Sequence, residues 1–123
     1  MEKGKVIKRG QGKVIMGGDE CTEIYAFTDK IVFSVSTLLP GQRACLDFGH
    51  KNANEICYVI QGKIVIHFPD EEEYHLLETG DAILIPPSVS HYSINVGEEK
   101  SITVWAGAGP DMEHFLTEEK VKT

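Results

Sequence analysis

The stretch Gly80-Asp81-Ala82-Ile83-Leu84-Ile85-Pro86-Pro87-Ser88-Val89-Ser90-His91-Tyr92-Ser93-Ile94-Asn95 decides the fold class. It consists of a turn, an apolar strand, a corner at Pro86-Pro87, and a second strand that begins with His91. Upstream, Gly49-His50-Lys51-Asn52-Ala53-Asn54-Glu55 precedes another apolar strand, which stops at Gly62. Two polar clusters that each open a strand predict a β fold with a shared site.

Short runs rich in β-branched and aromatic residues recur along the rest of the chain, separated by Gly, Pro and Asp. The predicted strands are residues 6–8, 13–16, 22–27, 31–39, 44–48, 55–60, 63–68, 74–77, 82–85, 91–96 and 101–106. This spacing, without a helical period between strands, predicts an all-β sandwich, jelly roll or closed barrel. Residues 110–120 are predicted to form one short C-terminal helix, because Pro110 and the acidic residues after it suit a first turn.

Length and charge restrict the function classes. A chain of 123 residues predicts a single domain, 1–123, with one hydrophobic core. The net charge of -7 argues against a nucleic-acid partner and against electrostatic attachment to anionic membranes. No apolar run approaches the length of a membrane span. A small-molecule ligand is the expected partner.

Cysteine usage predicts the compartment. Cys21, Cys45 and Cys57 are odd in number and irregularly spaced, so they do not form a disulfide framework. Buried free thiols indicate a reducing environment. No apolar run follows Met1, so no signal peptide is visible. We therefore expect a cytoplasmic protein.

The two polar clusters can form one metal site. Residues two apart on a strand share a face, so Glu55 and His91 can both point into the interior, and His50 can reach the same point from the rim. A buried carboxylate is costly unless a cation accompanies it. Two imidazoles and one carboxylate make the facial triad suited to non-haem Fe(II), and Mn, Ni, Co or Zn can occupy it too. The predicted ligands are His50, Glu55 and His91.

These residues resemble the two sequence motifs of the cupin superfamily over roughly residues 35–107. The second motif is matched by Gly80, Pro86, His91 and Asn95, which lie at the spacings of that motif. Ser88 stands in place of its inner glycine. The first motif is matched by Pro40-Gly41, His50, Glu55 and Gly62. The resemblance implies a double-stranded β-helix, or jelly-roll barrel, and a homodimer that pairs through N-terminal strands.

One ligand position departs from the family pattern. The usual cupin site has three histidines and a glutamate, and Phe48 stands where the first histidine is expected. Either a three-ligand metal site then remains, or another group takes the place of the missing histidine. Asp47 can do so only if a bulge reverses the strand alternation, and Asn52 could approach through the loop. The further alternative is that metal binding has been lost.

The resemblance implies several functions, because cupins carry many kinds of chemistry. The first hypothesis is a metal-dependent enzyme of dioxygenase, isomerase or lyase type that acts on a small organic metabolite. The second is a non-catalytic small-molecule binding or sensor module with a degraded or absent metal site. A third is a metal-free isomerase-like cupin that uses histidine as a base. The sequence assigns no catalytic residue.

Overall fold

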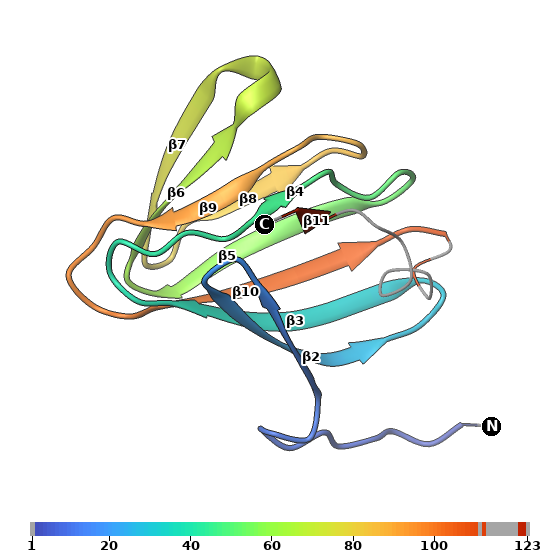
Figure 1. Cartoon of the computed structure of the whole chain (residues 1–123). Coiled ribbons are helices and arrows are strands. Elements are labelled where there is room, and N and C mark those ends of the chain that lie inside the picture. Colours follow the sequence, from blue (N-terminus) through green and yellow to red (C-terminus); the bar gives the residue numbers. More distant parts are fainter. Residues whose placement is uncertain (1, 111, 113–120, 123) are drawn as a thin grey trace.

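The computed structural model describes residues 2–110, 112, 121 and 122, and these form two facing antiparallel sheets (Figure 1). The larger sheet has the strand order β1-β2-β3-β10-β5-β8. Its strands are β1 (Lys13–Gly17), β2 (Glu20–Phe27), β3 (Ile31–Leu38), β10 (Ser101–Ala108), β5 (Asn54–Gln61) and β8 (Ala82–Ile85). Strands distant in sequence, such as β3, β10 and β5, are therefore neighbours, as a jelly roll requires.

The second sheet has the order β7-β6-β9 and covers the first (Figure 1). Its strands are β6 (Lys63–Phe68), β7 (Glu73–Glu78) and β9 (Tyr92–Asn95), with a short 3-10 turn, η1 (Pro69–Glu71), between β6 and β7. The short β4 (Leu46–Asp47) pairs with β11 (Val121–Lys122), and its Asp47 is bridged to His91, the residue before β9. These bridges join β4 to the second sheet beside the interior.

Two apolar clusters fill the interior between the sheets. The larger consists of Cys57, Val59, Ile64, Ile66, Phe68, Leu77 and Ile85, and the smaller consists of Ile24, Val32, Ala53 and Met112. Strand alternation supplies both, because every second residue of β3, β5 and β6 is buried. The predicted all-β jelly-roll fold is confirmed.

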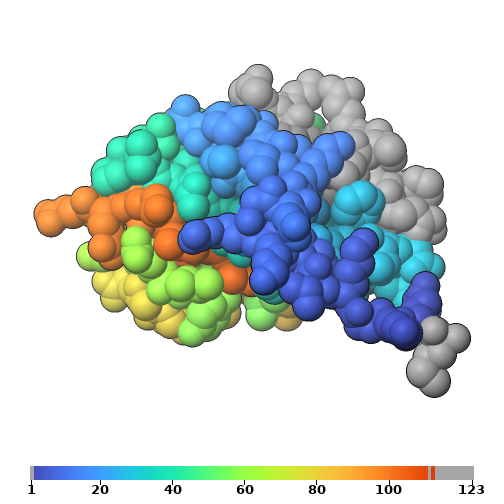
Figure 2. Space-filling model, turned by 90° about the horizontal axis from the view of Figure 1, so that it is seen from below, coloured from blue at the N-terminus to red at the C-terminus, as the bar shows by residue number. Residues whose placement is uncertain are grey.

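Two details differ from the predictions or lie beyond them. Residues 6–8 were predicted as a strand, but residues 2–12, which the structure describes, contain none before β1 begins at Lys13. The dark blue N-terminal residues instead run past the body of the molecule at one corner (Figure 2). The predicted helix at 110–120 falls almost entirely outside the described residues. No helix in the part of the chain that is described is long and apolar enough to cross a bilayer.

Candidate metal centre

A cavity of about 200 Å³ opens between the two sheets. Trp105, which packs against the larger apolar cluster, and Ile15, which packs against the smaller one, both line it, so the cavity lies between the clusters. Its wall also contains Met16, Gly17, Ala44 and Cys45, together with a set of polar side chains: Glu20, Thr22, Ser34, Ser36, Asp47, Glu55, His91, Tyr92 and Ser93. The interior of this barrel is therefore partly an acidic, hydroxyl-lined pocket.

Asp47 and His91 enter the cavity as a cross-strand pair. The amide of Asp47 donates to the carbonyl of His91 at 2.9 Å, and the amide of His91 donates to the carbonyl of Asp47 at 2.8 Å. Directly paired residues place their side chains on the same face of a ladder. Since His91 points inward, Asp47 does too, and its Oδ2 lies 4.0 Å from His91 Nε2.

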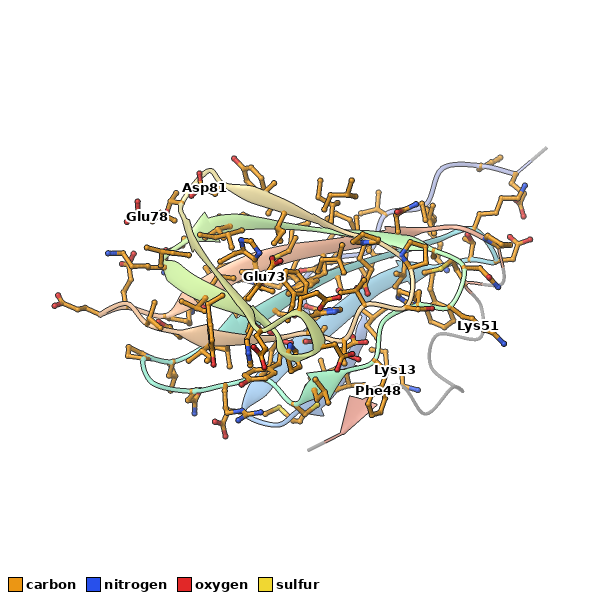
Figure 3. The ribbon with its side chains drawn as sticks, turned by 90° about the horizontal axis from the view of Figure 1, so that it is seen from above. Lys13, Phe48, Lys51, Glu73, Glu78 and Asp81 are labelled. Carbon is orange, nitrogen blue, oxygen red and sulfur yellow. The ribbon has the colours of Figure 1, made fainter. Side chains whose placement is uncertain are left out.

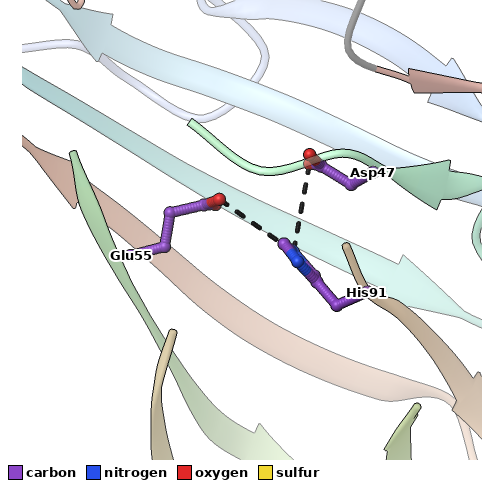
Figure 4. Close-up of side chains that lie close together, drawn as sticks. All are labelled: Asp47, Glu55 and His91. Atoms are coloured by element: carbon purple, nitrogen blue, oxygen red, sulfur yellow. Dashed lines mark ion pairs between the residues drawn. The ribbon is translucent and has the colours of Figure 1, made fainter. Parts of the chain in front are cut away.

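Glu55 approaches the same point from the opposite sheet. It is the second residue of β5, where alternation turns it inward, and it is buried. Its Oε1 lies 4.0 Å from His91 Nε2 (Figure 4). Ligand atoms of Asp47, Glu55 and His91 all lie within 4.8 Å of one another. Three strands thus bring two carboxylates and an imidazole together.

Neighbouring groups fix the orientation of the His91 ring. Its Nδ1 donates to the carbonyl of Val89 at 2.8 Å, which leaves the lone pair on Nε2 directed at the carboxylates. The indole of Trp105 stacks on the imidazole with centroids 5.8 Å apart, and Phe68 meets it edge-on at 6.3 Å. The ring is therefore held in the tautomer and direction that a metal ligand needs.

The donor set fits a divalent cation. Metal–nitrogen and metal–oxygen bonds of about 2.0–2.2 Å allow two ligands of one ion to lie at most about 4.4 Å apart. Both separations measured to His91 Nε2, 4.0 Å, are within that limit. Two carboxylates that face an imidazole lone pair repel unless a positive charge lies between them. A metal ion would supply that charge.

His50 lies at the edge of this group. It is buried, and its Nε2 is 3.8 Å from Glu55 Oε1. Its carbonyl accepts a hydrogen bond from Ser88 at 2.7 Å, which ties the first motif to the Pro-Pro corner of the second. The three mutually close donors are Asp47, Glu55 and His91, so the structure brings two predicted ligands together with Asp47 and places His50 beside Glu55.

Phe48, which stands where the first motif histidine is expected, does not line the cavity. Its side chain is 38% exposed and lies at the outer edge of the molecule (Figure 3). Gly49, at φ 83°, ends the extended backbone, and Asp47 Oδ1 accepts a hydrogen bond from its amide at 2.7 Å. The ladder to His91, rather than alternation counted from His50, decides that Asp47 points inward.

Glu20 is a cavity residue that the sequence interpretation missed. It opens β2 on the same face as Thr22 and Ile24, and its Oε2 accepts a hydrogen bond from Ser93 Oγ at 3.2 Å. Burial, followed by the charges of Asp47 and Glu55, raises the pKa of Glu20 to about 7, although hydrogen bonds from Ser93 and Thr22 oppose the rise. The sequence did contain a clue, because Glu20 is four residues before Ile24, and residues an even number apart on one strand share a face.

The buried cysteines do not resemble metal or redox sites. Burial raises the pKa of both Cys45 and Cys57, and the nearby carboxylates raise it further. A thiol with a raised pKa stays protonated at neutral pH, and the thiolate is the metal ligand and the nucleophile. The prediction that Cys57 is a small buried thiol agrees with its complete burial.

Comparison with known proteins identifies the family to which this chain is similar. A family model described as the Cupin domain matches residues 34–107. A germin-like protein of Arabidopsis thaliana, subfamily 1 member 4, is 28% identical over 68 residues, which are 50% of this chain and 31% of that protein. The chain therefore spans about a third of the length of that relative.

Solved structures show the same fold. KdgF from Halomonas sp. has a TM-score of 0.71 at 19% identity, and the match covers 87% of this chain and 94% of that one. The polyketide cyclase RemF from Streptomyces resistomycificus has a TM-score of 0.69 at 17% identity, with 96% of each chain covered. At these identities the likeness is one of fold.

Proposed function

This chain belongs to the cupin family, and from that premise we propose that it is a metal-binding cupin acting on a small organic metabolite. In this proposal Asp47, Glu55 and His91 hold one divalent transition metal ion, and the cavity beside them holds the substrate. The observation that carries it is the convergence of three buried or half-buried electron-pair donors within 4.8 Å. Such donor groups are stabilised by a cation.

The donor types bear on the choice of metal. Fe, Mn, Ni, Co and Zn were all expected from two imidazoles and one carboxylate. A set of two carboxylates and one imidazole has more hard oxygen donors than a set of two imidazoles and one carboxylate. This composition shifts the metal preference of the site toward Mn(II) and Fe(II). His50, which was predicted as one of three ligands, stays a candidate ligand beside Asp47, because its Nε2 is 3.8 Å from Glu55 Oε1.

The cavity favours a small ligand that carries hydroxyl or carbonyl groups. A bound ion would polarise a substrate oxygen. Ser34 and Ser36 offer hydrogen bonds from the wall, while Trp105 and Ile15 exclude water from the apolar part of a ligand. A volume of about 200 Å³ limits the ligand to metabolite size.

Glu20 suits a proton-transfer role in this cavity. In the metal-free protein, a carboxyl group with a pKa of about 7 is present in both protonation states near neutral pH, so it can donate or accept a proton. Its side chain lines the same cavity as the proposed metal ligands. This favours isomerase or lyase chemistry over oxygenation among the reaction types implied by the family.

Metal content of the purified protein tests the proposal. The untagged chain, loaded with Mn(II) or anaerobically with Fe(II) and then desalted, is expected to retain about one ion per chain. Asp47→Asn and His91→Gln are each expected to lose it. His67→Gln is the matched control, because His67 bonds to Tyr92 and stacks on Tyr74 instead of lining the cavity. Retention of the ion by the first two variants would refute the assignment.

A non-catalytic binding module is the second candidate. The cavity lined by Asp47, Glu55 and His91 can hold a small polar ligand without a metal. A wild-type protein that binds no Mn(II), Fe(II) or Zn(II) would favour this second candidate.

The variant His50→Gln tests whether His50 is a ligand. Loss of the metal from this variant would restore His50 to the ligand set, whereas retention of the metal would exclude it.

The remaining expectations accompany this proposal. A cytoplasmic location rests on the cysteines, since Cys21, Cys45 and Cys57 are all free thiols. A small-molecule ligand, rather than nucleic acid or membrane, stays the predicted partner because of the net charge of -7. Co-purification of a metabolite, identified by mass spectrometry after denaturation, would test the ligand directly.

A further inference from the structure

Two segments of the chain, 47–50 and 88–91, lie against each other beside the proposed metal ligands, and we call them the paired segments. Asp47 and His91 exchange two backbone hydrogen bonds at one end of the pair. At the other end, the carbonyl of His50 accepts a hydrogen bond from the second segment at 2.7 Å. The contact between the paired segments therefore affects three candidate ligands together.

Gly49 leaves no space between the paired segments for a side chain. A β-carbon placed on it would lie 2.9 Å from both the amide nitrogen and the carbonyl oxygen of Val89, and 3.3 Å from the carbonyl carbon of Ser88. All three atoms belong to the backbone, so no change of side-chain rotamer can make room. The φ of Gly49, 83°, also lies in the left-handed region that favours glycine. A larger residue at position 49 must therefore displace the second segment.

The Val89 carbonyl that a side chain at position 49 would meet is also the acceptor that orients His91. It accepts a hydrogen bond from Nδ1 of the imidazole at 2.8 Å. A carbonyl oxygen can only accept, so this bond places the ring proton on Nδ1 and leaves Nε2 as the electron-pair donor. Partners of this kind set the tautomer and the direction of a histidine that binds a metal. Displacement of Val89 would therefore change the ligand properties of His91.

The amide of Gly49 orients the second ligand. It donates to Oδ1 of Asp47 at 2.7 Å, while Oδ2 of the same carboxylate lies 4.0 Å from His91 Nε2 (Figure 4). An aspartate that accepts a hydrogen bond from the amide two residues further along forms a local turn, which restricts its side chain. One carboxylate oxygen is thus held by the backbone, and the other is directed at the imidazole.

We propose that Gly49 is a positioning residue of the metal site, which aligns Asp47 and His91 with each other. Its amide directs Asp47, and its lack of a β-carbon lets Val89 come close enough to hold the His91 ring. The inference rests on the proposed function, in which both side chains bind the ion. It goes further because it assigns metal affinity to a residue that supplies no ligand atom.

Gly41 offers a matched control for backbone strain. It has the same φ of 83° as Gly49, but a β-carbon placed on it would meet nothing within 4 Å. Alanine at either position is forced into the same left-handed backbone conformation, which L-residues disfavour. At position 49 alone it must also displace the backbone of Val89. The difference between the two alanine variants therefore isolates the contact between the paired segments.

The affinity of the full chain for Mn(II), measured by titration calorimetry, tests the proposal. Gly49→Ala is expected to bind Mn(II) about 10–100-fold more weakly than the wild type, which is the loss seen when a partner that orients a metal ligand is removed. Gly41→Ala is expected to keep the wild-type affinity. Equal affinities of the two variants would show that Gly49 does not position the site, although the metal-binding proposal itself would stand.

The tautomer of His91 in the metal-free chain gives a second readout that a merely structural role of Gly49 would not change. Long-range proton–nitrogen correlation spectra at about pH 8, where imidazoles are neutral, report which ring nitrogen carries the proton. In the wild type and in Gly41→Ala, His91 is expected to carry it on Nδ1. In Gly49→Ala the Nε2-protonated form is expected to appear, because the Val89 carbonyl moves away from the ring.

Two results would overturn the proposal. One is a folded Gly49→Ala variant that keeps both the Nδ1-protonated His91 and the wild-type affinity for Mn(II). The other is a wild-type spectrum in which His91 carries its proton on Nε2, and this result needs no variant to fold. A wild type that binds no Mn(II), but whose His91 tautomer changes in Gly49→Ala, would contradict the proposed function and still support the positioning of His91 by Gly49.

Discussion

Around the cavity, the six-stranded sheet reverses the usual distribution of polarity between its two faces. Its inner side carries Glu20, Thr22, Ser34, Ser36 and Thr103, which are buried or half-buried. Its outer side carries Phe33, Val104, Ile56, Tyr58 and Leu84, and several of these are exposed. An ordinary half-solvated sheet has the apolar residues inside and the polar residues outside.

This contrast is what the proposed function predicts for the inner face, and it leaves the outer side without a covering element among the described residues. Buried hydroxyls and carboxylates are costly unless something in the interior binds them, and the proposed metal ion with a hydroxylated ligand would do so. Exposed apolar residues are costly unless a second surface covers them. On β5 and β8, away from the cavity, the inward residues Cys57, Val59 and Ile85 belong to an ordinary apolar core.

The largest expected effect concerns the inner face. Mn(II) at about 100 times its Kd should stabilise the wild type by about 2.7 kcal/mol, because the ion binds only the folded site. Thermal unfolding with and without EDTA measures this as a shift of roughly 10 °C in Tm. Asp47→Asn should show almost no shift, and an equal shift in that variant would place the ion elsewhere.

Adjacent residues of β5 compare the two faces directly. Val59 is fully buried and Ile60 is 47% exposed. Val59→Ala should lower the free energy of unfolding by about 2.5 kcal/mol, since it removes buried carbon and leaves a cavity. Ile60→Ala should cost about 1 kcal/mol or less for the monomer. Urea denaturation at low protein concentration tests this, and equal costs would show that β5 does not alternate as described.

The pH dependence of stability reports on Glu20. Its pKa is raised from 4.5 to about 7 on folding, so between these values the folded, metal-free protein binds more protons than the unfolded chain. The free energy of unfolding must then fall as pH rises through this window, by about 2 kcal/mol, and level off above pH 7. Glu20→Gln should remove this decline in urea titrations from pH 5 to 8. A variant with the same pH profile as the wild type would contradict the role of Glu20.

The smallest effect compares two threonines on opposite faces. Thr103, on the inner face, accepts a hydrogen bond from Trp105 Nε1 at 2.9 Å, whereas Thr37 lies on the outer face of neighbouring β3. Thr103→Val should cost about 1 kcal/mol, because it removes that acceptor. Thr37→Val should change stability by less than about 0.5 kcal/mol, as half-exposed strand substitutions do. Equilibrium unfolding of the two variants measures the difference, and a larger cost at Thr37 would reverse the comparison.

Much of the fold could be predicted from local pattern. Alternation and turn residues located most strands within one or two residues, and the spacing of Gly80, Pro86, His91 and Asn95 pointed to the family. The predicted strand at residues 6–8 was wrong, because β-branched residues form a strand only where a neighbouring strand can pair with them. Glu20 was missed because the predicted strand began at residue 22.

The sequence by itself determined the alternation along each strand, and hence that Glu55 shares a face with Val59 and that His91 shares one with Asn95. The tertiary structure alone decided that Asp47 joins these residues while Phe48 turns outward. The physical reason is that strand parity is defined only relative to a hydrogen-bonded neighbour. For β4 that neighbour is His91, far along the chain, and Gly49 breaks the local count that would otherwise connect Asp47 to His50.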